Sequence, residues 1–94
     1  MNKAQMEKMR ELVGALTPVA DMAVLLDMPE GELRDELADP LSPAGKAYRR
    51  ARAEAALQMR LRDIAFASDP ESPARTAAAA NVAAYYAQMT ADEP

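Results

Sequence analysis

The residue types that enzymes use most often for catalysis are scarce in this chain of 94 residues, which contains no cysteine and no histidine. Their absence excludes disulfides, thiolate nucleophiles, zinc fingers and every histidine-based general base. The carboxylates Asp35, Glu36 and Asp39 are close in sequence, but no glycine-bearing loop with alternating ligands surrounds them, as a calcium loop requires. The glycines are isolated, so there is no phosphate-binding loop. We therefore expect no catalytic residue, no metal site, no cofactor and no enzymatic activity.

The charged residues are the remaining candidates for chemistry, and the two signs are separated along the chain. The formal net charge is −4, yet residues 21–39 contain seven acids against one base, Arg34. Residues 43–62 contain six bases against one acid, Glu54. This separation predicts a bipolar domain with an acidic and a basic region.

The basic segment has the pattern of a long helix, and its geometry groups the bases. At about 100° per residue, four of them project within one arc of roughly 100°. A basic stripe of this kind is typical of nucleic-acid binding; the alternative is a solvated face that pairs with the acidic segment. The candidate DNA-binding residues are Lys46, Arg49, Arg50 and Arg60, together with Arg34 in the acidic segment.

The second half of the same helix is predicted to be apolar on two opposed sides. Leu57, Leu61 and Ile64 fall on the side of the basic residues, which makes them the candidate oligomer interface. Either another helix of the chain covers them or a second subunit does. The opposite side, which we expect to face the domain core, consists of Tyr48, Ala51, Ala55, Met59 and Phe66.

Prolines mark the starts of the helices that must position these residues, because proline suits a first helical turn and disrupts a helix interior. A hydroxyl side chain as N-cap precedes a proline at Thr17-Pro18, Ser42-Pro43 and Ser72-Pro73, and Met28-Pro29 is a fourth start. No segment has the alternating pattern of a strand. We predict an all-α fold in a single domain, 1–94. Its five helices are expected at about 3–16, 18–26, 29–38, 43–67 and 73–89, before a frayed tail at 90–94.

Individual side chains within these helices are predicted to be buried. Leu16 closes the apolar stripe of the first helix. The buried stripe of the fifth helix is expected to consist of Ala74, Ala78, Val82, Tyr85 and Met89. Much of the apolar content is alanine, which buries little area per residue, so the core is thin. A thin core favours a partner subunit that contributes further burial. Residues 43–89 are expected to form a helical hairpin, which is the candidate oligomerisation region.

Residues 17–38 fit a helix-turn-helix, which needs a small residue in its first helix, a tight turn and apolar anchors on its second helix. Ala23 is the small residue, and Leu33 and Leu37 are the anchors. Asp27 stands where glycine is usual, although aspartate tolerates a left-handed backbone better than most residues. The alternative is an ordinary pair of short helices joined at residues 27–29.

The order of these segments resembles the terminase small subunits of phages and prophages over residues 17–89. The most specific piece is the run LSPAGKAYRRARAEAAL, and SPARTAAAANVAAYYAQM is similar to the closing helix of that family. The resemblance implies a helix-turn-helix followed by longer helices that assemble a ring. Such a ring binds double-stranded DNA at the packaging site and presents it to a large motor subunit. It therefore implies three partners, namely double-stranded DNA, further copies of the chain and a terminase large subunit-like protein.

Two features depart from that family. The helix at 29–38, which would read the DNA, carries four acids against Arg34, and DNA phosphates would repel it. The chain is also short, which leaves little room for a segment that contacts the large subunit. The alternatives are a protein-interaction module that keeps the helix-turn-helix shape without binding DNA, and a small transcriptional regulator. The sequence contains neither a signal peptide nor a stretch long enough to span a bilayer, so we expect a cytoplasmic protein without a membrane partner.

Overall fold

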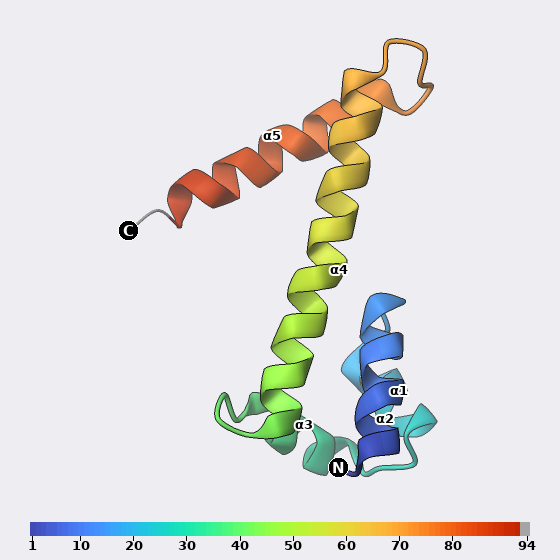
Figure 1. The fold of residues 1–94 in the computed structure, drawn as a ribbon, viewed down its shortest axis with the longest axis vertical. Coiled ribbons are helices and arrows are strands. Elements are labelled where there is room, and N and C mark those ends of the chain that lie inside the picture. The colour runs from blue at the N-terminus through green and yellow to red at the C-terminus, as the bar shows by residue number, and fades with distance from the viewer. Residues whose placement is uncertain (93–94) are drawn as a thin grey trace. The chain divides into compact units, whose positions relative to one another are not determined.

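The computed structural model describes residues 1–92, and it contains five helices and no strand over that range (Figure 1). The all-α prediction is therefore confirmed. The helices are α1 (Lys3–Gly14), α2 (Val19–Leu25), α3 (Glu30–Ala38), α4 (Pro43–Ser68) and α5 (Arg75–Ala91). The frayed tail predicted at 90–94 began too early, because α5 continues to Ala91. The last two residues of that predicted tail, 93–94, lie outside the described residues.

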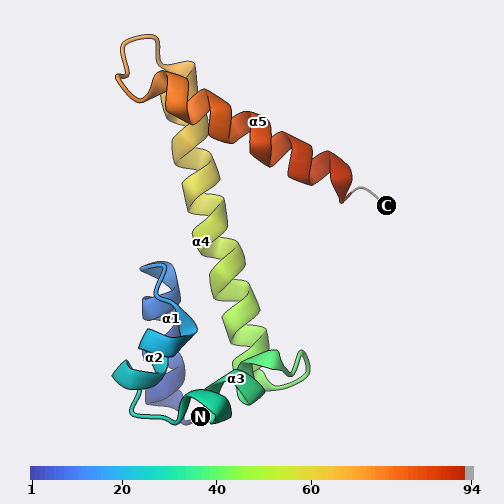
Figure 2. The same cartoon turned by 180° about the vertical axis from the view of Figure 1, so that it is seen from behind.

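Contacts divide the chain within α4 into two compact units, Met1–Ala55 and Ala56–Pro94. In the first unit, α1, α2, α3 and the beginning of α4 surround a common hydrophobic core, and Figure 2 shows these elements from behind. Met9, Met22 and Leu33 are completely buried there. Ala23 and Leu37 are also buried, at 3% and 6% exposure, as the helix-turn-helix pattern predicted for its small residue and its second anchor.

The turn between α2 and α3 is left-handed at Asp27, where φ is 53°. The Met28 N–H donates to the carbonyl of Ala23 at 3.0 Å, and the Asp27 N–H donates to the carbonyl of Val24 at 3.2 Å. These two bonds are the pattern of a Schellman motif, which satisfies the last carbonyls of a helix. Asp27 therefore occupies the position that glycine usually fills, as its place in the sequence pattern indicated.

A second left-handed residue, Leu16, ends α1 in the same way, with φ at 62°. The Leu16 N–H donates to Val13 at 2.9 Å and the Thr17 N–H donates to Leu12 at 3.0 Å. The predicted helix over 3–16 was therefore too long, and Leu16 is not part of the buried stripe, since it is 62% exposed. The apolar spacing continued past the helix end and masked the turn.

Replacing Leu16 with glycine is expected to stabilise the first unit. A left-handed backbone costs an L-residue about 1–2 kcal/mol, and glycine removes this cost. Glycine also has more conformational freedom in the unfolded chain, which offsets part of the gain, so the net stabilisation should be about 0.5–1 kcal/mol. Chemical denaturation followed by circular dichroism measures it. Leu16→Ala is the control, because it removes the same exposed side chain but keeps the strained backbone. An equal gain from both variants would assign the effect to the side chain instead.

The predicted helix starts proved correct at one of the three hydroxyl–proline pairs. At Ser42-Pro43, α4 begins at Pro43, and the Ser42 hydroxyl accepts a hydrogen bond from the Gly45 N–H at 2.9 Å. At Thr17-Pro18 the N-cap is Pro18, without a side-chain cap, and α2 begins at Val19. At Ser72-Pro73 the chain first forms a turn, and α5 begins only at Arg75. Pro18 therefore lies directly before α2, and Pro73 lies two residues before α5.

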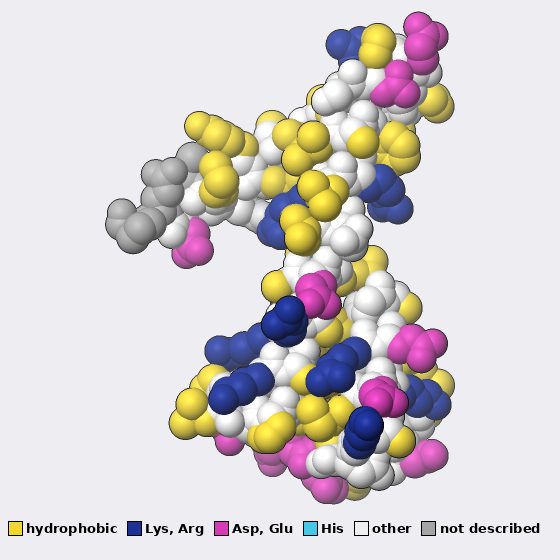
Figure 3. Space-filling view, in the orientation of Figure 1, with side chains coloured by type: hydrophobic (Ala, Val, Ile, Leu, Met, Phe, Trp, Pro, Cys, Tyr) yellow, Lys and Arg dark blue, Asp and Glu magenta, His cyan; other side chains and the backbone are white. Residues whose placement is uncertain are grey.

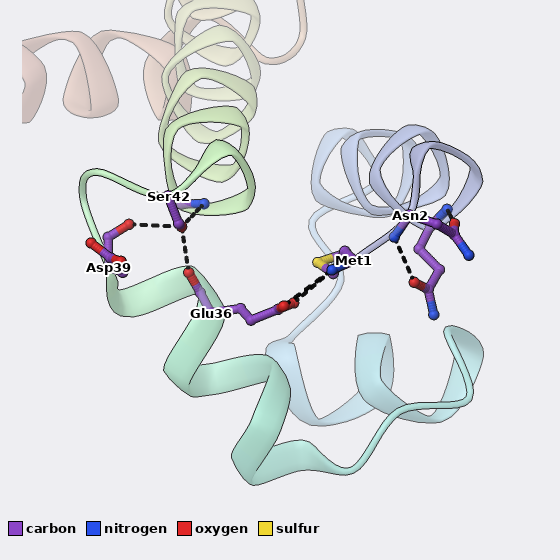
Figure 4. Close-up of polar contacts among 7 residues, drawn as sticks. Met1, Asn2, Glu36, Asp39 and Ser42 are labelled. Atoms are coloured by element: carbon purple, nitrogen blue, oxygen red, sulfur yellow. Dashed lines mark hydrogen bonds and ion pairs between the residues drawn. The ribbon is translucent and has the colours of Figure 1, made fainter.

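The connection between α3 and α4 is closely packed around Ser42 (Figure 4). The Ser42 hydroxyl lies 2.9 Å from the carbonyl oxygen of Glu36 and 3.0 Å from that of Asp39, so it can donate to either. The carboxylate of Glu36 in turn accepts from the Met1 amine at 3.1 Å. Gly45 lies against the same corner, and a Cβ built on it would overlap the Asp39 carbonyl oxygen. The isolated position of this glycine in the sequence gives no sign of its packing role.

The second unit contains the rest of α4 together with α5, and its core is small. Among its described residues only Ala78, at 3% exposure, and Asp63, at 9%, are buried. The predicted stripe of α5 is therefore correct at Ala78 and wrong at Met89, which is 58% exposed. Met59 and Phe66, expected to face the core, are 36% and 39% exposed. In a hairpin of two helices, each helix buries only the side that faces the other helix. The apolar residues on the remaining sides are therefore exposed.

Candidate functional site

The beginning of α4 turns its bases outward because its other side is anchored in the core. Ala44, Ala47 and Ala51 are buried on that side. Helical geometry places Lys46, Arg49 and Arg50 opposite these alanines, and all three are exposed. We call these three residues the basic face. Alanine anchors allow close packing of α4, and the long side chains opposite extend into solvent.

The basic face is not neutralised by the acidic segment. Within residues 1–92, no ion pair joins it to an acid of α2 or α3. The pair that Arg50 does form is with Glu54 of the same helix, at 3.0 Å, and the two side chains are 83% and 63% exposed. Such exposed pairs contribute about 0.3–0.5 kcal/mol, so a phosphate can displace the carboxylate at little cost.

Arg52 extends the basic surface, although the sequence analysis did not include it among the candidate residues. Its guanidinium lies over the ring of Tyr48, 5.5 Å from the centroid. Tyr48 packs in turn against the core of the first unit. The signal that could have identified this pair is the four-residue spacing between an aromatic ring and an arginine on one helix.

Arg34, the candidate on α3, has a different environment. It forms an ion pair with Glu30 at 3.5 Å on the same helix. The remaining acids near it, Glu32 and Asp35, are exposed. On the face of the first unit drawn in Figure 3, Lys and Arg side chains gather over α4 and α1, whereas Asp and Glu gather along the edge where α3 lies. The helix that reads DNA in most helix-turn-helix proteins therefore presents negative charge here.

Arg60, which the sequence analysis grouped with the basic face, belongs to the second unit and has an aromatic partner. Its guanidinium lies over the ring of Tyr85, 5.4 Å from the centroid, and the side chain is partly buried. The Tyr85 hydroxyl donates a hydrogen bond of 2.7 Å to the buried carboxylate of Asp63. Sequence reasoning missed this cluster, because 22 residues separate Asp63 from Tyr85 and only the turn between α4 and α5 brings them together.

The hydrogen bond to Asp63 raises the pKa of Tyr85 above its ordinary value of 10.0, because it favours the protonated phenol; desolvation adds to the shift. A raised pKa means that this bond stabilises the hairpin below about pH 10 and is lost as the pH rises through the shifted pKa. Absorbance titration should therefore show a late tyrosine ionisation. Tyr85→Phe should abolish this phase, whereas Tyr86→Phe should keep it; loss of the phase in Tyr86→Phe would contradict the assignment.

The candidate oligomer residues Leu57, Leu61 and Ile64 are 48%, 52% and 48% exposed. Within the second unit, α5 therefore leaves these three side chains about half exposed. Ile64 also lines a cleft of about 840 Å³ together with Val82, Tyr85 and Met89 of α5. Exposed leucine and isoleucine therefore lie beside an open apolar cleft in this unit.

Comparisons with known proteins add no relative. No protein family model, no curated protein and no solved structure matches the chain. None of the helices within the described residues combines the length and apolar character needed to cross a membrane.

Proposed function

We propose that this protein is a non-catalytic component of a phage or prophage DNA-packaging system, similar to terminase small subunits. In this proposal the basic face of α4 binds double-stranded DNA, and the second unit joins copies of the chain into an oligomer. A terminase large subunit-like protein is the partner that receives the DNA. The family resemblance of residues 17–89 supports the packaging role.

One observation carries the DNA part of the proposal. Lys46, Arg49 and Arg50 are exposed on a helix that is anchored from its other side, and the acids of α2 and α3 do not pair with them. Basic side chains that point to the same side and are not neutralised attract the phosphates of DNA. Their binding releases the counterions that surround the DNA. This interaction is independent of sequence, so the proposal includes no base-reading residue.

The acidic α3 favours a second candidate function, a protein-interaction module without DNA binding. Its exposed acids would repel phosphates if α3 entered the major groove. The same charge disfavours a transcriptional regulator that reads bases through α3. The two candidates differ in one property, which is whether the chain binds duplex DNA at low salt.

Fluorescence anisotropy with a labelled DNA duplex tests the proposal. We expect a Kd below about 10 μM at low salt, within the range of non-specific binding. The logarithm of the binding constant should fall with the logarithm of the salt concentration with a slope of about −3 per bound subunit, because each phosphate contact contributes about −0.9. Absence of binding at 10 μM would remove the DNA part and favour the protein-interaction module.

A further inference from the structure

The second unit has little buried apolar surface of its own. Over its described residues it is a two-helix hairpin in which Ala78 is the buried hydrophobic residue. Units of fewer than about 40 residues usually need a disulfide, a metal or a partner. The chain has no cysteine, and no group of acids among residues 1–92 could hold a metal ion. Protein surface outside this unit is the remaining source of burial.

Two adjoining features of this unit are suited to such a partner. Leu57, Leu61 and Ile64 fall within an arc of about 60° on α4, and we call them the ridge. The cleft beside the ridge is bounded by Ile64 on α4 and by Val82, Tyr85 and Met89 on α5. Ile64 belongs to both features, so ridge and cleft form one continuous apolar surface. In Figure 3, hydrophobic side chains gather over both helices of this unit.

The cleft has a defined shape because a polar cluster fixes α5 against α4. The 2.7 Å hydrogen bond from Tyr85 to Asp63 joins the two helices, and Arg60 lies over the Tyr85 ring. A buried carboxylate with a hydrogen-bond partner has one favourable arrangement, whereas alanine contacts alone would let the helices slide. Tyr85 and Arg60 both line the cleft, so its polar wall is held in place before anything binds.

The charge of the second unit indicates which partner fits. Its described residues carry three bases, Arg60, Arg62 and Arg75, and four acids, Asp63, Asp69, Glu71 and Asp92. Asp63 is buried, so the exposed charges balance. A nearly neutral surface neither attracts DNA nor selects a strongly charged protein, and it does not repel a copy of itself. The same unit also contains both an apolar projection and an apolar cleft.

We infer that the second unit is a self-association module in which the ridge of one copy inserts into the cleft of another. Leu57 and Leu61 of one chain would then be covered by Val82, Tyr85 and Met89 of its neighbour. This inference rests on the self-association in the proposed function, and it names the two surfaces that meet. The side chain of Met89 adapts to the inserted ridge because it is flexible and polarisable.

Mixing two complementary variants tests the inference. Leu61→Glu damages the ridge and Met89→Glu damages the cleft, because each places a carboxylate in an apolar contact. Light scattering should report monomers for each variant alone. An equimolar mixture should form heterodimers, since one copy still has an intact cleft and the other an intact ridge. Ala80→Glu is the control: Ala80 is exposed on the side of α5 opposite Ala78 and should leave assembly unchanged.

A second measurement covers the case in which the glutamate variants do not fold. The chain has no native cysteine, so Leu61→Cys in one copy and Met89→Cys in another supply the only thiols. Under mild oxidation a mixture of the two should form disulfide-linked heterodimers, and substituting Ala80→Cys for either should abolish them.

Four results would overturn the inference. Wild-type protein that is monomeric would remove self-association while leaving the DNA part of the proposed function intact. If Met89→Glu formed the same assemblies as the wild type, the cleft would be excluded as the contact surface, and the proposed function would be unaffected. Assemblies without the expected disulfide would show that ridge and cleft do not face each other. A small apolar molecule that binds the cleft of a monomeric chain would likewise identify a ligand site instead of an interface.

Discussion

Gly45→Ala is expected to destabilise the first unit by about 2–3 kcal/mol, in the upper part of the range of about 1–3 kcal/mol for overpacked core substitutions. The added Cβ would overlap the Asp39 carbonyl oxygen, which belongs to the backbone and cannot rotate away, and would come within 2.9 Å of the Ser42 hydroxyl. Relief requires α4 to move away from the end of α3, which also breaks the Ser42 cap. For a domain of this size the midpoint of thermal unfolding, followed by circular dichroism, should fall by about 10–20 °C.

Gly31→Ala is the matched control, because the same atom is added to an exposed helix. A Cβ at Gly31 meets nothing within 4 Å. Alanine has a higher helix propensity than glycine by about 0.8–1.0 kcal/mol, so this variant should be more stable than the wild type. If Gly45→Ala were as stable as Gly31→Ala, the close packing of α4 on the α3 corner would be incorrect, and with it the direction in which the basic face points.

Arg49→Ala combined with Arg50→Ala is expected to weaken DNA binding by about 10- to 30-fold at low salt, since two phosphate contacts are lost. The slope of the salt dependence should become less steep by about 2, because each contact contributes about one counterion. Both side chains are exposed, so the fold should be unchanged. Anisotropy titrations at several salt concentrations measure the affinity and the slope together.

The control for this prediction removes the same charge from a different place. Arg62 and Arg75 are exposed in the second unit, and Arg62→Ala combined with Arg75→Ala also lowers the net charge by two. This control should bind DNA within about threefold of the wild type, since it loses only long-range attraction. Equal losses in the two double variants would mean that DNA responds to overall charge and that α4 has no distinct binding face.

The sequence was sufficient for the helical class because proline positions and apolar spacing agree over most of the chain. Ser42-Pro43 shows the signal at its strongest, since the hydroxyl caps the helix and proline fills its first turn. Helix ends were harder to predict. Leu16 continues the apolar spacing of α1 but adopts a left-handed backbone, and no residue type at that position signals a turn. The helix propensity of single residues does not show which of the last helix carbonyls will accept hydrogen bonds from the residues that follow the helix.

The candidate site was only partly accessible from sequence. Helical geometry predicted which bases share a face, and the exposure of Lys46, Arg49 and Arg50 agrees with it. It could not predict that Arg60 stacks on the Tyr85 ring, or that the Asp63 carboxylate accepts a hydrogen bond from the Tyr85 hydroxyl, because both contacts depend on where α5 meets α4. Burial of the second half of α4 was overestimated for the same reason. The apolar pattern shows which side of the helix favours burial, but not whether another part of the same chain buries it.

The most direct test of the proposed DNA-binding face uses single cysteines as attachment points for a photoreactive crosslinker. Ala53 is exposed and falls within the arc of Lys46, Arg49 and Arg50, so Ala53→Cys reports on the basic face without removing a charge. Gly31→Cys reports on α3. With duplex DNA at low salt, we predict crosslinks from position 53 and few from position 31. Crosslinks mainly from position 31 would contradict the account, because they would place the acidic α3 against the DNA.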